Sequence, residues 1–292
     1  MTLAPLLITG PTASGKSAYA LARAAREPSL IINADSMQVY RDLRVLTARP
    51  SVEDEARLPH ALYGFVSGRE AYSAGRYVAD VAGVLATAEA AGLRPMIVGG
   101  TGLYFMALLE GLSPVPPIPD DTRAHWRATA ASMEPAELHA MLAACDPVMG
   151  QRLRPSDPQR VTRALEVLAA TGISLAVWQQ TAGTPLIDAE RCEKVVIAPD
   201  RETLYARADA RFDAMIASGA REEVRALAAL GLDPSLPVMR ALGVPRLMQH
   251  GRGEIGLEAA VAVAKLETRR YIKRQLVWIR RHMIAWNNVV AQ

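Results

Sequence analysis

The sequence of 292 residues predicts an α/β fold: a P-loop NTPase-like parallel sheet flanked by helices, with an all-helical insertion domain. Three observations predict it. Short, continuously apolar runs alternate with helical patterns, as in parallel sheets that are covered on both faces. The first apolar run leads directly into a glycine-rich phosphate-binding motif. After residue 112 only helical patterns occur until one more apolar run returns the chain to the sheet.

The predicted core alternates strands with helices. Four apolar runs are predicted strands: Pro5–Thr9, Ser29–Ala34, Pro95–Val98 and Lys194–Ala198. A helix is predicted from Lys16 to about Arg26, and another from Tyr77 to Ala91 with apolar residues at Val78, Val81 and Leu85. Helices are expected after residue 198, with breaks at Asp233–Pro237 and near Gly251–Gly253.

The pattern of the sequence changes at the start of the insertion. Ser113–Pro119 contains four prolines and is therefore neither helix nor central strand. From Asp120 to Gln180 the apolar residues keep a helical period, with breaks at Asp146-Pro147 and Pro155–Pro158. We therefore predict a P-loop core domain with C-terminal helices (residues 1–112 and 191–292) and a helical insertion domain (residues 113–190).

Composition excludes several classes of protein. Half of the residues are hydrophobic and 22% are charged, which excludes a disordered chain. Cys145 and Cys192 are too few for a disulfide framework and fit a reducing compartment. The five histidines do not fall at metal-ligand spacing. No apolar run reaches the roughly 18 residues of a membrane span, and no signal-peptide pattern opens the chain, so a cytoplasmic protein is expected.

Residues 10–17 match the phosphate-binding pattern G-x-x-x-x-G-K-[ST] between a predicted strand and a predicted helix. The members of the loop are Gly10, Pro11, Thr12, Ala13, Ser14, Gly15, Lys16 and Ser17. Its backbone N–H groups and the helix N-terminus can bind an anion. Lys16 adds a positive charge, and the Ser17 hydroxyl can ligate Mg²⁺. The motif predicts a phosphate ligand without identifying it.

Two further residues lie at the ends of predicted strands. Asp35 follows the second strand, at the edge of an open parallel sheet where ligands bind. It could ligate Mg²⁺ in an ATP-using enzyme, serve as a general base, or simply cap the next turn. Thr101, in the run VGGTGLY, could donate to a diphosphate oxygen or cap the helix that follows.

Taken together, the motifs resemble those of the tRNA dimethylallyltransferase (tRNA isopentenyltransferase) family, of the bacterial type. In chain order they are GPTASGKS, ADSMQVYRDL, TARP, YSAGRY, VGGTGLY, ALLEGL, DPQRVTRALEV, RFDAMIASGAREEV and KRQLVWIR. The resemblance implies transfer of a dimethylallyl group from dimethylallyl diphosphate to N6 of the adenosine 3′ of the anticodon, tRNA position 37. The tRNAs would be those that read codons beginning with U. The loop would then hold a diphosphate leaving group, with Mg²⁺, rather than ATP.

The resemblance also assigns catalytic roles. An adenine amine is a poor nucleophile because its lone pair is delocalised into the ring, so a base is needed near its N–H, and Asp35 fits that role. Lys16, Mg²⁺ and Arg211 would stabilise the departing diphosphate, and Thr101 would lie where donor and acceptor meet. Arg211 belongs to a predicted helix whose apolar stripe is Leu204, Ala208, Phe212 and Met215. A solvated basic face is the alternative for Arg211.

Because the target base must leave its stack to react, a surface that grips RNA is expected. The residues that the resemblance assigns to tRNA are Asp35, Ser36, Met37, Gln38, Thr101, Arg123, Gln159, Arg160, Val161, Thr162 and Arg163. Ser156-Asp-Pro-Gln159 predicts a capping box at the start of a helix. In a merely solvated face a carboxylate would balance each arginine, and only Glu166 is placed to do so.

A second basic region covers Lys265–His282, with seven lysines and arginines against Glu267. Its apolar stripe is Ile272, Leu276, Ile279 and Met283. This predicts an amphipathic helix with a cationic face toward a polyanion rather than a membrane. Tyr271, Trp278 and Trp286 are expected in the core or at its edge.

Three positions depart from the family pattern, and none is one of the four predicted catalytic residues. They are Arg49 in place of lysine, Ala61 in place of a second histidine, and Val244 in place of tyrosine. The alternatives are a P-loop small-molecule or nucleotide kinase, an adenylate isopentenyltransferase acting on free nucleotide, and a non-catalytic RNA-binding module. The helical insertion and the basic helix favour tRNA, through its anticodon stem-loop, as the partner of a monomer.

Overall fold

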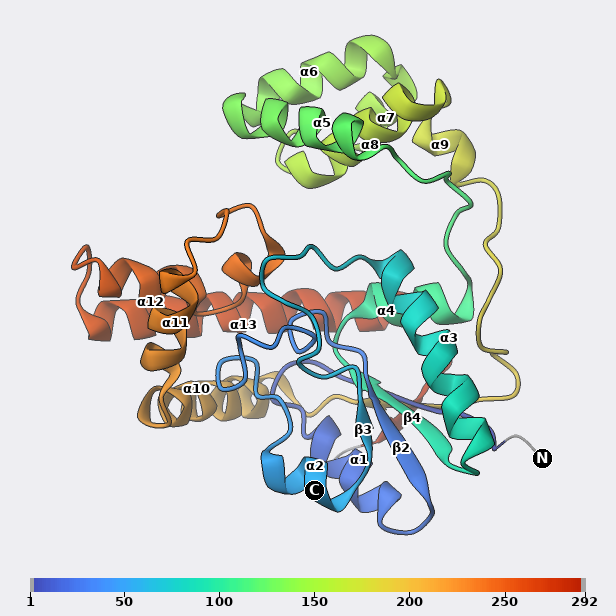
Figure 1. The fold of residues 1–292 in the computed structure, drawn as a ribbon, viewed down its shortest axis with the longest axis vertical. Coiled ribbons are helices and arrows are strands. Elements are labelled where there is room, and N and C mark those ends of the chain that lie inside the picture. The colour runs from blue at the N-terminus through green and yellow to red at the C-terminus, as the bar shows by residue number, and fades with distance from the viewer. Residues whose placement is uncertain (1–2, 290–292) are drawn as a thin grey trace. The chain divides into compact units, whose positions relative to one another are not determined.

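The computed structural model describes residues 3–289 and divides the chain into two compact units. The core unit comprises Met1–Leu109 and Leu186–Gln292, and the helical unit comprises Glu110–Pro185. Figure 1 shows the elements of each unit. These boundaries lie within a few residues of the predicted ones.

The core unit is built on a six-stranded parallel sheet with the order β3-β2-β4-β1-β5-β6. The strands are β1 (Leu6–Thr9), β2 (Ser29–Asn33), β3 (His60–Ala61), β4 (Arg94–Gly99), β5 (Glu193–Ile197) and β6 (Asn287–Val289). The four predicted strands are confirmed. Strands β3 and β6 were not predicted, because two or three residues without an apolar run leave no recognisable pattern.

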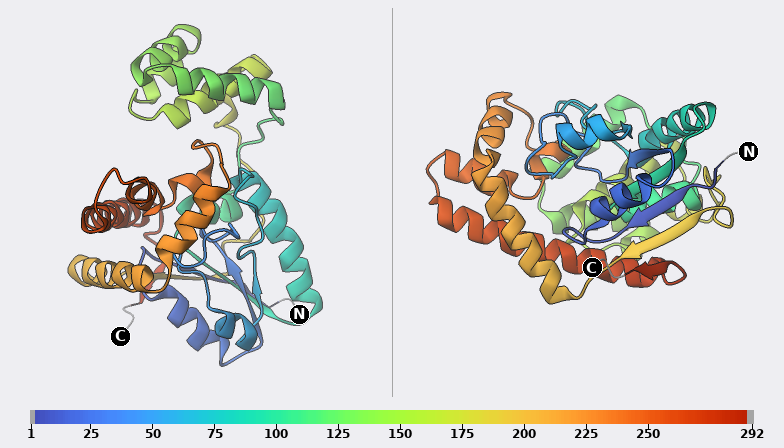
Figure 2. Two further views of the ribbon diagram at one scale, coloured as in Figure 1. Left: turned by 60° about the vertical axis from the view of Figure 1, so that its left-hand side comes forward. Right: turned by 90° about the horizontal axis from the view of Figure 1, so that it is seen from below.

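Helices cover both faces of this sheet (Figure 2). The helices of the core unit are α1 (Lys16–Ala24), α2 (Val52–Arg57), α3 (Ala74–Ala90), α4 (Gly102–Leu109), α10 (Arg201–Ala217), α11 (Ala220–Ala229), α12 (Val244–Gly251), α13 (Leu257–His282) and the 3₁₀-helix η1 (Pro237–Arg240). Leu6 and Ile8 pack with α1, whereas Leu7 packs with α3 and α4. Successive residues of a strand point to opposite faces, so two buried faces require the continuous apolar runs seen in the sequence.

A third cluster of buried side chains joins α10, α11, α12 and α13 to the loop after β2. The predicted stripe on α10 is confirmed, because Leu204, Ala208, Phe212 and Met215 are all buried. On α13, Ile272 is buried while Leu276 and Ile279 are half-buried. This cluster places the C-terminal helices beside the carboxyl ends of the strands, where ligands bind in open parallel sheets.

The helical unit has its own small core. Its helices are α5 (Asp120–Ser132), α6 (Pro135–Cys145), α7 (Pro147–Arg152), α8 (Pro158–Thr171) and α9 (Leu175–Trp178). Asp157 caps α8 by accepting the Arg160 N–H at 3.2 Å. The predicted capping box at Ser156 is therefore wrong. Proline fits the first position of a helix and disfavours helical geometry in the residue before it, which makes Asp157 the cap.

Across the part of the chain that the structure describes, no helix combines the length and apolarity needed to span a membrane. Cys145 and Cys192 are both free thiols, as expected for a chain without a disulfide framework.

Candidate active site

The loop between β1 and α1 forms a concave anion site. A side chain at Gly10 would place Cβ 2.3 Å from the Ile197 carbonyl oxygen, so only glycine fits there. Ala13 and Gly15 adopt left-handed conformations with φ of 64° and 91°, which wrap the loop tightly. The first N–H groups of α1 have no acceptor within the helix, and no side chain caps them. These donors remain available to a phosphate.

Lys16, Asp35 and Arg211 line one cavity of about 290 Å³ in the core unit. They come from the phosphate loop, the end of β2 and α10, three segments far apart in the chain. Ser36, Met37 and Gln38 also line it, and its apolar wall includes Leu46, Phe212 and Met215. The cavity can therefore hold a ligand with both a charged and an apolar part.

The charges in this cavity favour an anion. The pKa of Lys16 is lowered to about 8, chiefly by burial; nearby Asp35 opposes this shift and Arg211 adds to it. Burial also lowers the pKa of Arg211, again opposed by Asp35. Two partly desolvated cations thus share one carboxylate. Bound phosphate oxygens would supply the missing negative charge.

Asp35 combines the two roles that the sequence left open. Its Oδ1 accepts the Met37 N–H at 2.9 Å, which is the local turn-capping role. Within residues 3–289 no hydrogen bond uses Oδ2, so this oxygen can take a proton from a ligand. Burying only one oxygen of the carboxylate in a turn fixes the direction of the other.

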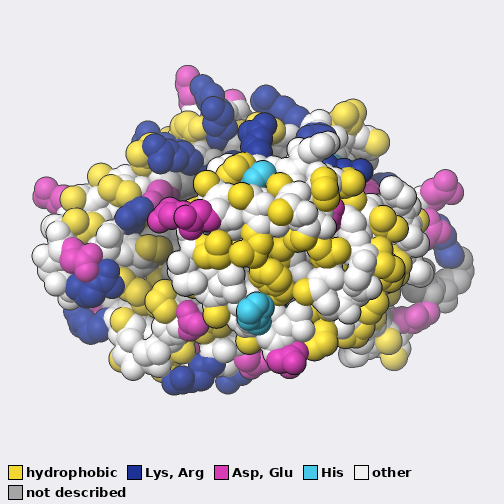
Figure 3. All heavy atoms as spheres, turned by 90° about the horizontal axis from the view of Figure 1, so that it is seen from above, with side chains coloured by type: hydrophobic (Ala, Val, Ile, Leu, Met, Phe, Trp, Pro, Cys, Tyr) yellow, Lys and Arg dark blue, Asp and Glu magenta, His cyan; other side chains and the backbone are white. Residues whose placement is uncertain are grey.

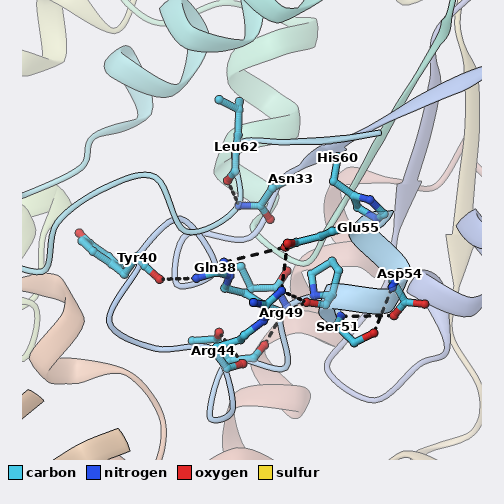
Figure 4. A network of polar contacts seen from close by, with 12 residues as sticks. Asn33, Gln38, Tyr40, Arg44, Arg49, Ser51, Asp54, Glu55, His60 and Leu62 are labelled. Carbon is cyan, nitrogen blue, oxygen red and sulfur yellow. Dashed lines mark hydrogen bonds and ion pairs between the residues drawn. The ribbon is translucent and has the colours of Figure 1, made fainter. Parts of the chain in front are cut away.

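The backbone of Asp35 is held by Asn33, which sequence reasoning missed. The Asn33 amide donates to the Asp35 carbonyl at 2.9 Å and to the Leu62 carbonyl at 3.0 Å, while its Oδ1 accepts the Asp35 N–H at 2.8 Å. Figure 4 shows Asn33 directed toward Leu62. A fully buried amide at the end of an apolar strand was the available signal.

Thr101 lies immediately before α4, but its hydroxyl does not cap that helix. Instead Oγ1 accepts the Ser36 N–H at 2.9 Å and lies 3.3 Å from the Ser36 hydroxyl. The Thr101 N–H donates to the Ala34 carbonyl at 3.1 Å. Thr101 therefore contacts the residues on both sides of Asp35, and the capping role that the sequence also allowed is not the one its hydroxyl takes.

The loop after β2 is held by side chains that sequence patterns did not assign. Gln38 donates to the carbonyls of Thr47 and Ala48 at 2.8 and 3.1 Å, so its amide nitrogen is used within the loop (Figure 4). Arg49 is largely buried, bonds the Tyr40 carbonyl at 3.4 Å and lies 3.9 Å from Glu55. Burial lowers the pKa of Arg49. This departure from the family pattern holds the loop together.

Ser17 lies apart from the main cavity. It is exposed and lines a second cavity of about 120 Å³ with Arg49, Asp54 and His60. No group of three or more His, Cys, Asp or Glu that could hold a metal occurs among residues 3–289. The Ser17 hydroxyl is an oxygen ligand of the kind that Mg²⁺ accepts alongside substrate phosphates.

Helix α13 contributes more to the cavity than the sequence suggested. Thr268, Tyr271 and Arg274 line it, together with Arg240 of η1. Tyr271 is partly buried, as expected for the edge of the core, and the side of it that is not covered faces this cavity. Tyr271 and Thr268 are three residues apart and share one face of α13, and that face turns toward the phosphate loop. The other two aromatics agree with expectation: Trp286 is buried, and Trp278 would meet a side chain at Gly102.

The cationic face of α13 is partly neutralised from α10. Lys265 pairs with Asp213 at 2.6 Å, and Arg269 pairs with Asp209. No ion pair in the described residues involves the other basic side chains of the region, Arg270, Lys273, Arg274, Arg280 and Arg281. A cationic surface therefore remains, smaller than the sequence implied.

More arginines of α8 are paired with a carboxylate than the sequence predicted. Arg160 pairs with Asp157 at 3.2 Å, and Arg163 pairs with Glu166 at 3.3 Å. The statement that only Glu166 balances an arginine is therefore wrong, because the helix cap supplies a second carboxylate. Figure 3 shows basic side chains along the upper edge of one face of the molecule, with acidic ones among them.

The predicted tRNA-binding residues of the helical unit divide into two groups. Gln159 and Arg160 are exposed and Arg163 is half-buried. Val161 is fully buried in the unit's core, and the Thr162 hydroxyl donates to the Pro158 carbonyl at 2.8 Å. These two side chains are unavailable to RNA, because α8 turns them inward. Arg123 is partly exposed, donating to the Ile118 carbonyl at 3.0 Å and lying 3.6 Å from Asp120.

Fold and site together define a P-loop α/β protein whose cavity combines an anion cradle with a carboxylate and an apolar wall. Residues 38–282 match the family model described as IPP transferase, and residues 4–60 match one described as isopentenyl transferase. The chain belongs to the IPP transferase family, as its motifs indicated.

Relatives of high identity span almost the whole chain. A protein of Methylobacterium nodulans is 55% identical over 275 residues, covering 94% of this chain and 91% of its own length. One of Nitrobacter hamburgensis is 54% identical over 278 residues, covering 95% and 88%. Both are named tRNA dimethylallyltransferase.

Solved structures share the fold. The tRNA isopentenylpyrophosphate transferase of Bacillus halodurans aligns with a TM-score of 0.70 and 28% identity, covering 98% of this chain and 89% of its own. A eukaryotic dimethylallyltransferase that acts on tRNA aligns with a TM-score of 0.78 and 24% identity, covering 94% and 70%. The predicted P-loop-like fold is thereby confirmed.

Proposed function

We propose that this protein is a tRNA dimethylallyltransferase. It transfers a dimethylallyl group from dimethylallyl diphosphate to N6 of the adenosine 3′ of the anticodon, position 37, in tRNAs that read codons beginning with U. The main support for this proposal is that Lys16, Arg211 and Asp35 line the same cavity, beside an apolar wall. The names of the relatives support the same activity.

The reaction requires a base and a stabilised leaving group. The N6 lone pair forms a bond to C1 of the donor, the C1–oxygen bond breaks, and the electron pair leaves with the diphosphate. Asp35 accepts the N6 proton on Oδ2, since Oδ1 is held by the Met37 N–H. Asn33 and Thr101 keep this carboxylate in place through backbone contacts on both sides of it.

The loop and two cations bind the diphosphate. The N–H groups at the start of α1 and the Lys16 ammonium are directed to its oxygens, and Arg211 meets them from α10. Ser17 is the residue that would hold Mg²⁺, which when bound neutralises charge on the leaving group. The apolar wall of Leu46, Phe212 and Met215 suits the dimethylallyl chain.

Residues of both units bind the tRNA in this proposal. Gln159, Arg160 and Arg163 of α8 and Arg123 of α5 meet its backbone, and Asp35–Gln38 surround the extruded adenine. Val161 and Thr162 are left out of this set because they are buried. We place the enzyme in the cytoplasm as a monomer, where its free thiols remain reduced.

Mass spectrometry of tRNA nucleosides tests this proposal. After incubation of unmodified tRNA with the protein, dimethylallyl diphosphate and Mg²⁺, N6-dimethylallyladenosine is expected. Reactions with MgATP as donor, or with AMP as acceptor, are expected to give no product. Phosphate transfer from ATP would indicate a kinase, and prenylation of AMP alone would indicate a free-nucleotide enzyme.

A further inference from the structure

The side chain of Gln275 lies between the two glycine-rich turns of the active site. It projects from α13 and is 8% exposed. Its Oε1 accepts the Thr12 N–H of the phosphate loop at 2.9 Å, and its Nε2 donates to the Gly100 carbonyl at 3.1 Å. One amide thus connects the turn after β1 to the turn after β4.

The fit around this amide is close. A Cβ at Gly100 would lie 2.6 Å from Gln275 Nε2 and 3.8 Å from Lys16 Nζ. Glycine at position 100 therefore leaves the space that the amide occupies, next to the lysine that meets the diphosphate. Because Oε1 bonds one turn and Nε2 bonds the other, both ends of the Gln275 amide are needed to connect them.

The phosphate loop needs such support. Ala13, the residue after Thr12, adopts a left-handed conformation with φ of 64°. This conformation costs an alanine about 1 kcal/mol or more relative to the right-handed one. A loop with this cost keeps its shape only when neighbouring structure holds it. Gln275 holds the loop from outside at the residue before the strained one.

We propose that Gln275 is a positioning residue for the prenyl donor. By joining Thr12 to Gly100 it keeps the phosphate loop wrapped before the ligand arrives, so that the loop N–H groups and Lys16 converge on the diphosphate. The same contact keeps this loop in register with the turn that carries Thr101. The inference rests on the proposed function, of which it concerns the donor half.

The test is Gln275→Met, which preserves length and apolar contacts but removes both hydrogen bonds. The Kd for inorganic pyrophosphate, measured by calorimetry without tRNA, is expected to rise about tenfold, and the KM for dimethylallyl diphosphate with it. The KM for tRNA is expected to stay within twofold. Ala260→Gly is the matched control, since it weakens the buried side of α13 at its other end.

Several results would overturn the inference. The first is an unchanged pyrophosphate Kd in folded Gln275→Met. The second is a loss of pyrophosphate affinity in Ala260→Gly as large as that in Gln275→Met. The third is a loss of tRNA affinity in Gln275→Met as large as its loss of pyrophosphate affinity. If Gln275→Met does not fold, Gln275→Glu serves instead, because it keeps an acceptor for Thr12 and loses the donor to Gly100; undiminished pyrophosphate binding there also overturns it. A wild-type protein that binds pyrophosphate but prenylates no tRNA would refute the proposed function, not this inference.

Discussion

Two arginine-bearing helices, α10 and α8, show how differently one residue type is used in the two units. Arg211 of α10 is half-buried and faces Asp35 and Lys16. Arg160 and Arg163 of α8 each pair with a carboxylate on their own helix or its cap. A desolvated cation interacts strongly with a charge that develops beside it, whereas an exposed pair contributes little and is readily exchanged. Arg211 has no ion-pair partner among the described residues, so we predict that it acts on the leaving group, and that the paired Arg160 and Arg163 act in RNA binding.

The largest expected effect lies on the chemical side. Asp35→Ala removes the proposed base, and kcat is expected to fall by roughly 10²–10⁴-fold. The Kd for tRNA is expected to stay within a few fold, because the arginines proposed to bind the RNA backbone are unchanged. Single-turnover assays and filter binding give the two quantities. If kcat and the affinity for tRNA fell to the same extent, Asp35 would act mainly in tRNA binding.

Arg211→Ala is expected to lower kcat/KM for the donor by roughly 10²-fold, because it removes a buried positive group from the leaving group. Arg207→Ala is the matched control, one turn earlier on α10 and exposed. It is expected to change donor kinetics by less than twofold. If the two variants behave alike, the distinction between buried and exposed arginines fails within a single helix.

Arg160→Ala combined with Arg163→Ala is expected to weaken tRNA binding about tenfold and to make the slope of log Kd against log salt less steep by one to two units, roughly one per phosphate contact. Saturating tRNA should restore kcat. Arg26→Ala combined with Arg57→Ala, which removes two exposed arginines of the core unit, is the charge-matched control. An unaltered salt slope in the double variant would show that these exposed cations do not meet RNA.

The smallest effect concerns pH. The pKa of Lys16 in the free protein is about 8, below its unfolded value of 10.5. The charged form is therefore disfavoured by folding, so stability rises as pH increases through this interval. Pyrophosphate needs the charged form, and its affinity should fall several-fold between pH 7 and 8.5. Lys16→Arg, which stays charged, should bind more weakly but show a flatter profile by calorimetry.

Lys16→Met gives the corresponding stability test. Removing a poorly solvated charge is expected to raise the unfolding free energy at pH 7 by roughly 1–2 kcal/mol, because the ammonium is held away from water without a carboxylate in contact. Thermal melts at pH 7 and pH 9.5 measure it. A stability gain that is equal at both pH values would point to packing instead of charge.

The sequence by itself determined four of the six strands, the phosphate loop and the position of Asp35. Each depends on residues close together in the chain: an apolar run, the spacing of glycines before a lysine, or an acid after a strand. The stripe on α10 was equally readable, because a helical period of 3.6 residues brings Leu204, Ala208, Phe212 and Met215 to one face.

Only the tertiary structure decided which side chains support those residues. Gln275 has no local pattern, because its partners Thr12 and Gly100 lie in distant turns, and only one partner of Asn33, Leu62, is distant in the chain. Tyr271 lines the cavity for the same reason: the neighbours of a helix decide which of its faces borders a site. The acids that neutralise α13 lie on α10, where spacing along α13 could not reveal them. Periodicity along a chain encodes the shape of an element, whereas a contact between elements depends on how they pack.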